Sequence, residues 1–332
     1  MGIVGVAQTR HAERRDDVNH AELAFEVVSD LLARTGWSHD RIDTVITASS
    51  DFWDGRTISD MAVQDAVGAA GKSASKVSMD GTFALVYAAA RIGSGAYRTC
   101  LVVAHGKASE GNPRLIANAA FDPIFQRPMG IDDHTALGLQ ARCFLDRRGL
   151  TSEVLAEAAA RSAAAAATNP NAQRRQAAHA LVADPLHEDE IAPDSDGACA
   201  VLLADAETMP GEAVWLLGEP GVLPQVAREA YRSAGIQDPD RELDVVEVHD
   251  ASSAQTLLWR EGLGLSEAGG PAWNPSGGAM SAQPGFATGL VRVAEVFERL
   301  ARGDGKTGLA HGMTGFVGQA HCAWILRRRS RA

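Results

Sequence analysis

The chain has 332 residues, more than one hydrophobic core usually organises, so we expect two lobes. Apolar residues make up 45% and charged residues 22% of the chain, a composition typical of folded globular proteins and unlike that of disordered ones. The net charge of -11 argues against nucleic acid as a partner, because binding phosphates requires a basic face.

Cysteine spacing and apolar run length exclude further classes of protein. The four cysteines are widely spaced and form no C-x-x-C pair, so we expect neither a metal site nor a disulfide framework. No apolar run approaches the roughly 20 residues that cross a bilayer, and no signal peptide is recognisable. We therefore expect a cytoplasmic protein with no membrane contact.

The first half of the chain alternates apolar runs typical of strands with runs of helical spacing. The predicted ranges are 2–8, 42–48 and 100–105 for strands, and 21–34, 58–70 and 84–94 for helices. This alternation favours right-handed crossovers and a mainly parallel sheet. Residues 106–135 break the pattern with prolines, glycines and isolated aromatic residues. We expect a long loop there, of the kind that covers a site or an interface.

After two predicted helices at 135–147 and 151–167, the strand and helix pattern begins again beyond residue 205. The predicted ranges are 214–218, 243–248, 307–310 and 321–326 for strands, and 225–233, 254–262 and 287–302 for helices. The repetition suggests an internal duplication. We assign one lobe to residues 1–205, including the long loop 106–135, and the other to residues 206–332.

Polar and glycine residues follow the apolar runs at several places, where open α/β sheets build their sites. His249 and Asp250 follow one predicted strand, and His311 lies at the end of another. Ser78 and Asp80 lie at a turn that enters a helix, where free N–H groups favour negative charge. Asp80 either caps this helix or faces a reacting group. The other candidates are Asn274, Ser276, Gly277, Gly278, Gln283 and His321.

The sequence motifs that contain these residues resemble those of the sterol-carrier-protein-x type branch of the thiolase superfamily. They are V-E-V-H-D at 246–250, N-P-S-G-G at 274–278, A-T-G at 287–289, D-S-D-G-A at 194–198 and A-H-G at 310–312. The resemblance covers nearly the whole chain. It implies a five-layered α-β-α-β-α thiolase fold, with two similar lobes and mainly parallel mixed sheets. It also implies a homodimer that acts on acyl-coenzyme A, with coenzyme A entering as part of the substrate and no permanently bound cofactor.

Carrying the family's catalytic groups onto this sequence shows which of them are missing. Family members that perform thiolysis acylate a cysteine, and that position falls on Ser78. The H-D-C phrase keeps His249 but has Ala251 in place of its cysteine, and the histidine of the G-H-P phrase becomes Gln283. A serine hydroxyl needs a strong adjacent base to attack a thioester. Ordinary thiolysis is therefore not expected.

Retro-aldol cleavage of a carbon–carbon bond needs no acyl-enzyme and remains open. His249, Gln283 and backbone N–H groups near Gly277 and Gly278 are candidate donors to an enolate oxygen. His311 and His321, with Asp250 or Asp80, are candidate acids and bases. Gly277, Gly278, Asn274, Ser276 and His321 are candidate contacts to the thioester, although Asn274 and Ser276 also suit a role in holding the turn.

Relatives from steroid side-chain breakdown that lack the cysteine act as aldolases with a small OB-fold and zinc-ribbon partner, and this sequence is similar to them. We therefore expect an acyl-coenzyme A lyase of this type. The alternatives are acyl transfer within a complex or by Ser78, and a non-catalytic subunit that binds a partner. Candidates for binding the coenzyme A nucleotide, chosen by position and charge, are Lys107, Arg114 and Arg127.

Overall fold

The computed structural model describes residues 1–55, 58–173, 179–209 and 213–329. In this part of the chain, ten strands form a continuous sheet in the order β10-β9-β11-β12-β8-β1-β7-β4-β2-β3. The strands are β1 (Gly2–Gln8), β2 (Thr44–Ala48), β3 (Ser73–Val77), β4 (Thr99–Lys107), β7 (Asp196–Ala204), β8 (Ala213–Gly221), β9 (Val245–Glu247), β10 (Ala272–Trp273), β11 (Thr307–Thr314) and β12 (Ala320–Arg329). A separate hairpin contains β5 (Leu181–Ala183) and β6 (Leu186–His187).

The sheet repeats one arrangement on each side of the β1–β8 contact. In the first half, β2 pairs in parallel with β3 and β4, while β7 runs antiparallel between β4 and β1. In the second half, β9 pairs in parallel with β10 and β11, while β12 runs antiparallel between β11 and β8. The halves are thus mixed sheets of the same order. The lobe limits at residues 205 and 206, which fall between β7 and β8, stay a prediction.

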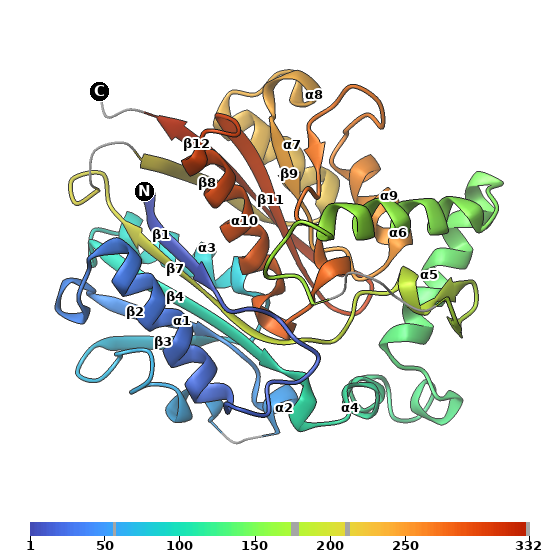
Figure 1. The fold of residues 1–332 in the computed structure, drawn as a ribbon, viewed down its shortest axis with the longest axis horizontal. Coiled ribbons are helices and arrows are strands. Elements are labelled where there is room, and N and C mark those ends of the chain that lie inside the picture. Colours follow the sequence, from blue (N-terminus) through green and yellow to red (C-terminus); the bar gives the residue numbers. More distant parts are fainter. Residues whose placement is uncertain (56–57, 174–178, 210–212, 330–332) are drawn as a thin grey trace.

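Helices lie between and outside the two halves of the sheet (Figure 1). Helices α3 (Gly81–Gly93) and α10 (Thr288–Arg302) pack in the middle, where Leu85 and Leu290 share one core with residues of both halves. Helix α1 (His20–Thr35) covers the outer face of the first half. Helices α7 (Leu223–Ala234) and α9 (Ser253–Gly262) cover that of the second half. The predicted five-layered α-β-α-β-α architecture is confirmed.

The excursion between β4 and β7 is more helical than predicted. It contains α4 (Pro113–Ala120), α5 (Asp133–Arg148) and α6 (Glu153–Ala166), which lie beside the layers in Figure 1. The prediction of a loop is wrong at 113–120. Asn112 caps α4 through its side chain, and Pro113 fits the first turn, where its missing N–H costs no bond. These start signals were present in the sequence.

The helix predicted at 58–70 is also wrong. In this segment a short 3-10 helix at Ser59–Ala62 is followed by turns, and Gly68 has a φ of +69°, which a right-handed helix cannot contain. The two remaining helices, α2 (Asp51–Asp54) and α8 (Pro239–Glu242), are single turns. No helix among the described residues is long and apolar enough to span a membrane.

Candidate functional site

Asp80 lies where the N-termini of α3 and α10 meet. Its Oδ1 accepts hydrogen bonds from the Thr82 N–H (2.9 Å) and the Thr82 hydroxyl (2.7 Å), and its Oδ2 accepts one from the Gly289 N–H (2.8 Å). Gly289 is required, because a Cβ there would lie 2.1 Å from Asp80 Oδ1. Two helix N-termini therefore stabilise this buried carboxylate, and its role as a helix cap is confirmed.

The imidazole of His249 faces this carboxylate. Its Nδ1 lies 3.4 Å from Asp80 Oδ2, slightly beyond hydrogen-bond distance, and the residue is 8% exposed. The backbone of His249 is held on both sides. Its N–H donates to the carbonyl of His311 (3.1 Å), and its carbonyl accepts from the indole N–H of Trp259 (3.0 Å). Asp80 thus orients Nδ1 and leaves Nε2 for another group.

His311 and His321 come from the neighbouring strands β11 and β12 and form a buried pair. Nε2 of His311 lies 2.9 Å from Nδ1 of His321. Burial, together with the nearby charge of His249, lowers the pKa of His321 to about 4 although a backbone hydrogen bond at Gly318 opposes this. Burial likewise holds the pKa of His311 well below its usual value. Both rings are neutral at pH 7, so one donates and the other accepts.

These four side chains make up what we call the histidine cluster (Asp80, His249, His311 and His321). Nδ1 of His249 and Nδ1 of His311 are buried there without a hydrogen-bond partner. Buried polar atoms are usually bonded, and an exception calls for an explanation such as a bound water, a bound ion or a catalytic role. The structure therefore brings together four of the predicted candidates. No group of three or more His, Cys, Asp or Glu side chains in the described ranges is arranged to hold a metal ion.

Asp250 follows His249 but belongs to a different set of contacts. Its Oδ2 accepts from the Thr256 hydroxyl (2.6 Å) and the Asn274 amide (2.8 Å), and its Oδ1 accepts from the Ala279 N–H (3.0 Å). Burial raises the pKa of this carboxyl to about 7, although these hydrogen bonds oppose the shift. Because Asp250 is fully buried and occupied, the contacts favour a structural role over the predicted catalytic one.

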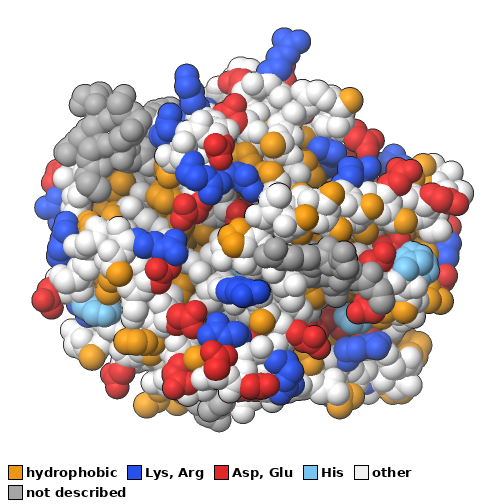
Figure 2. Space-filling model, in the orientation of Figure 1, with side chains coloured by type: hydrophobic (Ala, Val, Ile, Leu, Met, Phe, Trp, Pro, Cys, Tyr) orange, Lys and Arg blue, Asp and Glu red, His pale blue; other side chains and the backbone are white. Residues whose placement is uncertain are grey.

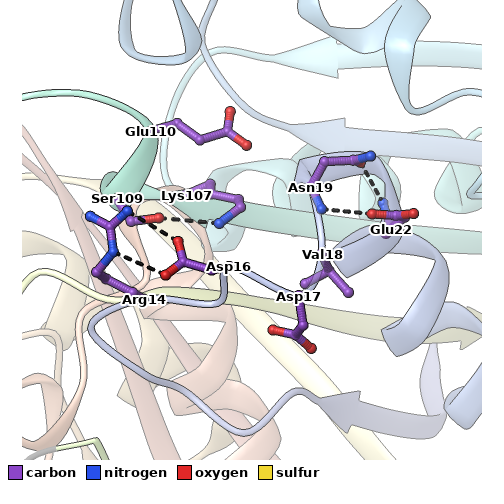
Figure 3. A pocket seen from close by; sticks show the side chains of 9 residues that line it. All are labelled: Arg14, Asp16, Asp17, Val18, Asn19, Glu22, Lys107, Ser109 and Glu110. Carbon is purple, nitrogen blue, oxygen red and sulfur yellow. Dashed lines mark hydrogen bonds and ion pairs between the residues drawn. The ribbon is translucent and has the colours of Figure 1, made fainter.

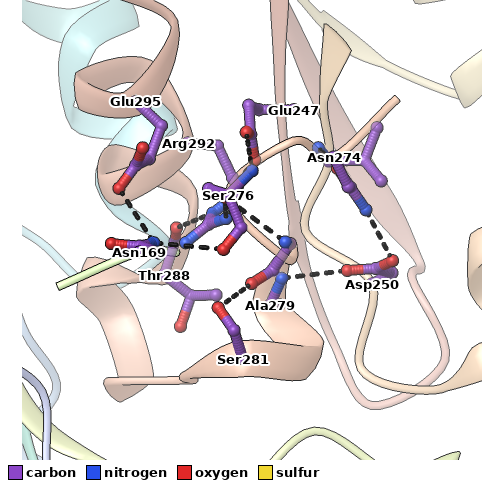
Figure 4. Close-up of polar contacts among 12 residues, drawn as sticks. Asn169, Glu247, Asp250, Asn274, Ser276, Ala279, Ser281, Thr288, Arg292 and Glu295 are labelled. Atoms are coloured by element: carbon purple, nitrogen blue, oxygen red, sulfur yellow. Dashed lines mark hydrogen bonds and ion pairs between the residues drawn. The ribbon is translucent and has the colours of Figure 1, made fainter. Parts of the chain in front are cut away.

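The N-P-S-G-G turn is fixed by buried charges (Figure 4). The Ser276 hydroxyl donates to Glu247 Oε2 (2.6 Å), and Nη1 of Arg292 donates to Ser276 Oγ (2.7 Å) and Glu247 Oε2 (3.0 Å). Burial raises the pKa of the Glu247 carboxyl, and the Arg292 charge opposes that shift. We call the whole set the loop brace, and its members are Glu247, Asp250, Asn274, Ser276 and Arg292.

Gly277 and Gly278 allow the turn to follow this brace. Their φ values are +96° and +64°, and a Cβ on Gly278 would lie 2.4 Å from the Asn274 amide nitrogen. Asn274 itself has a φ of +43° and holds the Val248 N–H with its side-chain oxygen at 2.7 Å. The contacts of Asn274 and Ser276 support the turn-holding role that the sequence left open.

Ser78 and Gln283 lie outside both clusters. Ser78 is exposed beyond the end of β3, and no hydrogen bond joins it to a histidine within the described residues. Gln283 is anchored through its backbone, since its N–H donates to the Ser195 hydroxyl (2.9 Å) and its carbonyl accepts from the Ser195 N–H (3.2 Å). Its Oε1 is buried without a partner. Oε1 is therefore available as an acceptor, and Nε2 makes no hydrogen bond within the described residues, so it is available as a donor.

A groove of about 1390 Å³ reaches the backbone that holds Gln283. Pro193 and Asp194 line one part of it, and the Gln283 N–H also donates to the Pro193 carbonyl (3.2 Å). Arg10, Arg15 and His134 line other parts, together with several acidic residues. Positive and negative side chains are likewise interspersed over the face drawn in Figure 2.

The three cations expected to bind the nucleotide each have a partner within the chain. Lys107, beside a smaller hollow (Figure 3), donates to Asp196 (2.8 Å) and the Arg15 carbonyl (2.9 Å). Arg114 donates to Asp132 (2.6 Å), and Arg127 donates to the Phe121 carbonyl (2.8 Å). These contacts favour structural roles for all three.

No family model matches the chain. Over 253 residues, 62% of this chain and 66% of the relative, it is 28% identical to the acetyl-CoA acetyltransferase of Methanothermobacter thermautotrophicus. Over 158 residues, 35% of this chain and 28% of the relative, it is 32% identical to sterol carrier protein 2 of Oryctolagus cuniculus. The matched regions thus span less than two thirds of either relative.

Solved structures match over the full length. The Ltp2-ChsH2(DUF35) aldolase superposes with a TM-score of 0.81 at 20% identity, covering 100% of this chain and 98% of that one. Human mitochondrial 3-ketoacyl-CoA thiolase superposes with a TM-score of 0.78 at 15% identity, covering 99% and 98%. The resemblance to the thiolase superfamily is confirmed, and the chain has the thiolase fold.

Proposed function

We propose that the protein cleaves a carbon–carbon bond of β-hydroxyacyl-coenzyme A thioesters by a retro-aldol reaction. The observation that carries this proposal is the histidine cluster. It contains a carboxylate-oriented imidazole beside two neutral imidazoles, with no thiol in the nucleophile position. Such a cluster suits proton transfer and support of an enolate, and does not suit acylation.

In the proposed reaction, Nε2 of His249 takes the proton of the β-hydroxyl group. The carbon–oxygen bond becomes a carbonyl, the Cα–Cβ bond breaks, and its electron pair moves to Cα to form a thioester enolate. The amide of Gln283 and a neutral imidazole of the pair are the proposed donors to the enolate oxygen. The His249 imidazolium, stabilised by Asp80, then protonates Cα and releases the shortened thioester.

Acyl transfer is disfavoured by the surroundings of Ser78. An alkoxide would need a base at hydrogen-bond distance, and the described residues place no histidine there. Cys322 and Cys199 are no substitutes, because both are fully buried and burial raises the pKa of the Cys199 thiol far above neutrality.

The proposal includes a homodimer and a second protein. Strand β3 lies at one end of the sheet and pairs only with β2 in the described structure, so its open edge suits pairing with another copy. The name of the Ltp2-ChsH2(DUF35) aldolase joins two proteins. We propose that an OB-fold and zinc-ribbon protein likewise binds this chain. Exposed Leu115, Ile124, Phe125 and Met129 offer an apolar surface for one of these contacts.

The test compares two substrate classes, using the protein purified alone and with an OB-fold and zinc-ribbon protein from its host. β-Hydroxyacyl thioesters without free coenzyme A are expected to give a shorter acyl-coenzyme A and a carbonyl product, detected by mass spectrometry. β-Ketoacyl thioesters with free coenzyme A are expected to remain intact. His249→Gln should lose the first activity, while His39→Gln, which alters an exposed histidine, should keep it. Cleavage of only the β-keto substrate would instead support acyl transfer.

A further inference from the structure

Trp259, which the sequence analysis did not select as a candidate, lies against all three histidines of the histidine cluster. Trp259 is 7% exposed and projects from α9, the helix that begins just after His249. Its indole N–H bonds the His249 carbonyl at 3.0 Å. Its ring meets His321 edge to face, with centroids 4.8 Å apart and planes at 80°, and its centroid lies 6.0 Å from that of His311.

The turn between β11 and β12 is also packed against this indole. A Cβ on Gly318 would lie 2.8 Å from Trp259 and 2.9 Å from His321, so only glycine fits between them. Gln140 holds the same turn, since its amide donates to the Val317 carbonyl at 2.9 Å. The Gln140 side-chain oxygen accepts from Gln255 at 2.8 Å. The turn is therefore fastened to α9 on both sides.

We propose that Trp259 is a positioning residue that sets the distance between His249 and the His311–His321 pair and keeps water away from that pair. This inference rests on the proposed use of the histidines in proton transfer. The hydrogen bond acts on the backbone of His249, whereas the ring contact acts on the side chain of His321. Two substitutions distinguish these effects, because Trp259→Phe removes the N–H donor but keeps a smaller aromatic ring, whereas Trp259→Leu removes both the donor and the aromatic ring.

The groups that face His321 define the expected pH behaviour. They are the His311 ring at hydrogen-bond distance, the backbone of Gly318 and the charge that His249 acquires on protonation. In Trp259→Leu, water should reach the His321 ring, and its pKa should rise toward the ordinary value of about 6.5. In Trp259→Phe the His321 pKa should stay low, while the His249 resonances should shift because its carbonyl loses a hydrogen bond.

The test is a pH titration of imidazole nitrogens by NMR in protein labelled with ¹⁵N-histidine, with assignments from single His→Gln variants. Trp273→Phe is the matched control, because this tryptophan lies in the same half of the sheet and packs on Arg260. A rise of about one unit or more in the His321 pKa for Trp259→Leu, absent in the control, supports the proposal. Unchanged His321 and His249 titrations in folded Trp259→Leu and Trp259→Phe would overturn it.

The NMR titration does not depend on turnover, so it distinguishes failure of the positioning role from failure of the proposed function. If the titrations shift but no thioester is cleaved by any variant, the proposed function fails and the positioning role stands. If the parent protein is active, both Trp259 variants should lower kcat with little change in KM, because Trp259 acts on the positions of the histidines and not on the binding of the substrate.

Discussion

The histidine cluster and the loop brace are two buried polar groups that begin at consecutive residues. His249 belongs to the first and Asp250 to the second. In the loop brace, the Asp250 carboxylate and the Ser276 hydroxyl are each bonded to two or more groups. In the histidine cluster, ring nitrogens of His249 and His311 are buried without partners. The loop brace shapes the backbone, and the histidine cluster is where the proposed reaction takes place.

Breaking the loop brace should have the largest effect on stability. Arg292→Met leaves the buried Glu247 carboxylate without its closest cation and should lower the free energy of unfolding by about 3–5 kcal/mol. Arg299→Met, on the same helix but 3.9 Å from Glu247 and partly exposed, is the matched control and should cost much less. Urea denaturation of both variants provides the measurement. Equal losses would mean that the brace is not organised around Arg292.

The histidine cluster should respond in the opposite way. His249→Gln should lower the rate of thioester cleavage by about 10²–10⁴-fold, the usual contribution of a general base. The free energy of unfolding should change by less than about 1 kcal/mol, because Nδ1 of the ring makes no hydrogen bond that would be lost. Steady-state kinetics of the variant test the expected loss of rate, and urea denaturation of the same preparation tests the expected stability. A large loss of stability would indicate that His249 has a structural role.

Acid should also distinguish the two clusters. The folded-state pKa of His321, about 4, lies below its unfolded value, so the unfolded state gains a proton first and stability falls as the pH drops from about 6.5 toward 4. Buried His11 and His105, with pKa values lowered to about 3 and about 4, act in the same direction.

The titration of Asp250 has the opposite effect on stability to that of these histidines. Its raised pKa of about 7 means that the folded state gains a proton as the pH falls through 7, which stabilises it. In His321→Gln, the loss of stability between pH 6.5 and 4 should be less steep, by up to about 1.4 kcal/mol per pH unit. Urea denaturation at several pH values measures this slope. Parallel curves for the parent and the variant would contradict the neutral state of His321.

The smallest effect is expected at the former nucleophile position. Ser78→Ala should change the rate of cleavage by less than about twofold and leave stability unchanged, because the residue is exposed and outside both clusters. Intact-protein mass spectrometry after incubation with acyl-coenzyme A should show no acyl group on the parent protein. A stable acyl adduct that disappears in Ser78→Ala would restore the acyl-transfer alternative.

Periodicity predicted most strands and helices, because long apolar runs such as those of β4 and α10 bury one face or both. It failed at 58–70, where Gly68 interrupts the helical pattern, and at β10, which has two residues and leaves no periodic signal. The caps at Asn112 and Asp80 were readable as local signals.

Some features of the candidate site could also be predicted from the sequence, and others could not. Phrases in the sequence identified His249, His311 and His321, but the contact between His311 and His321 depends on the register of β11 with β12. Trp259 gave no signal, since an indole in an amphipathic helix is typical of a core. The separation of His249 from Asp250 was likewise hidden, because the direction of consecutive side chains after a strand depends on the turn that follows.

Proton transfer by the histidine cluster can be measured as exchange of the α-protons of acetyl-coenzyme A and propionyl-coenzyme A in deuterium oxide. This exchange reports formation and reprotonation of the enolate, and it can be measured without knowing the full substrate. With the OB-fold and zinc-ribbon protein present, we predict deuterium at Cα for the parent protein and His39→Gln, and a loss of about 10²-fold or more for His249→Gln. Exchange at the same rate in His249→Gln, or none above the protein-free control, would contradict the proposed role of the histidine cluster.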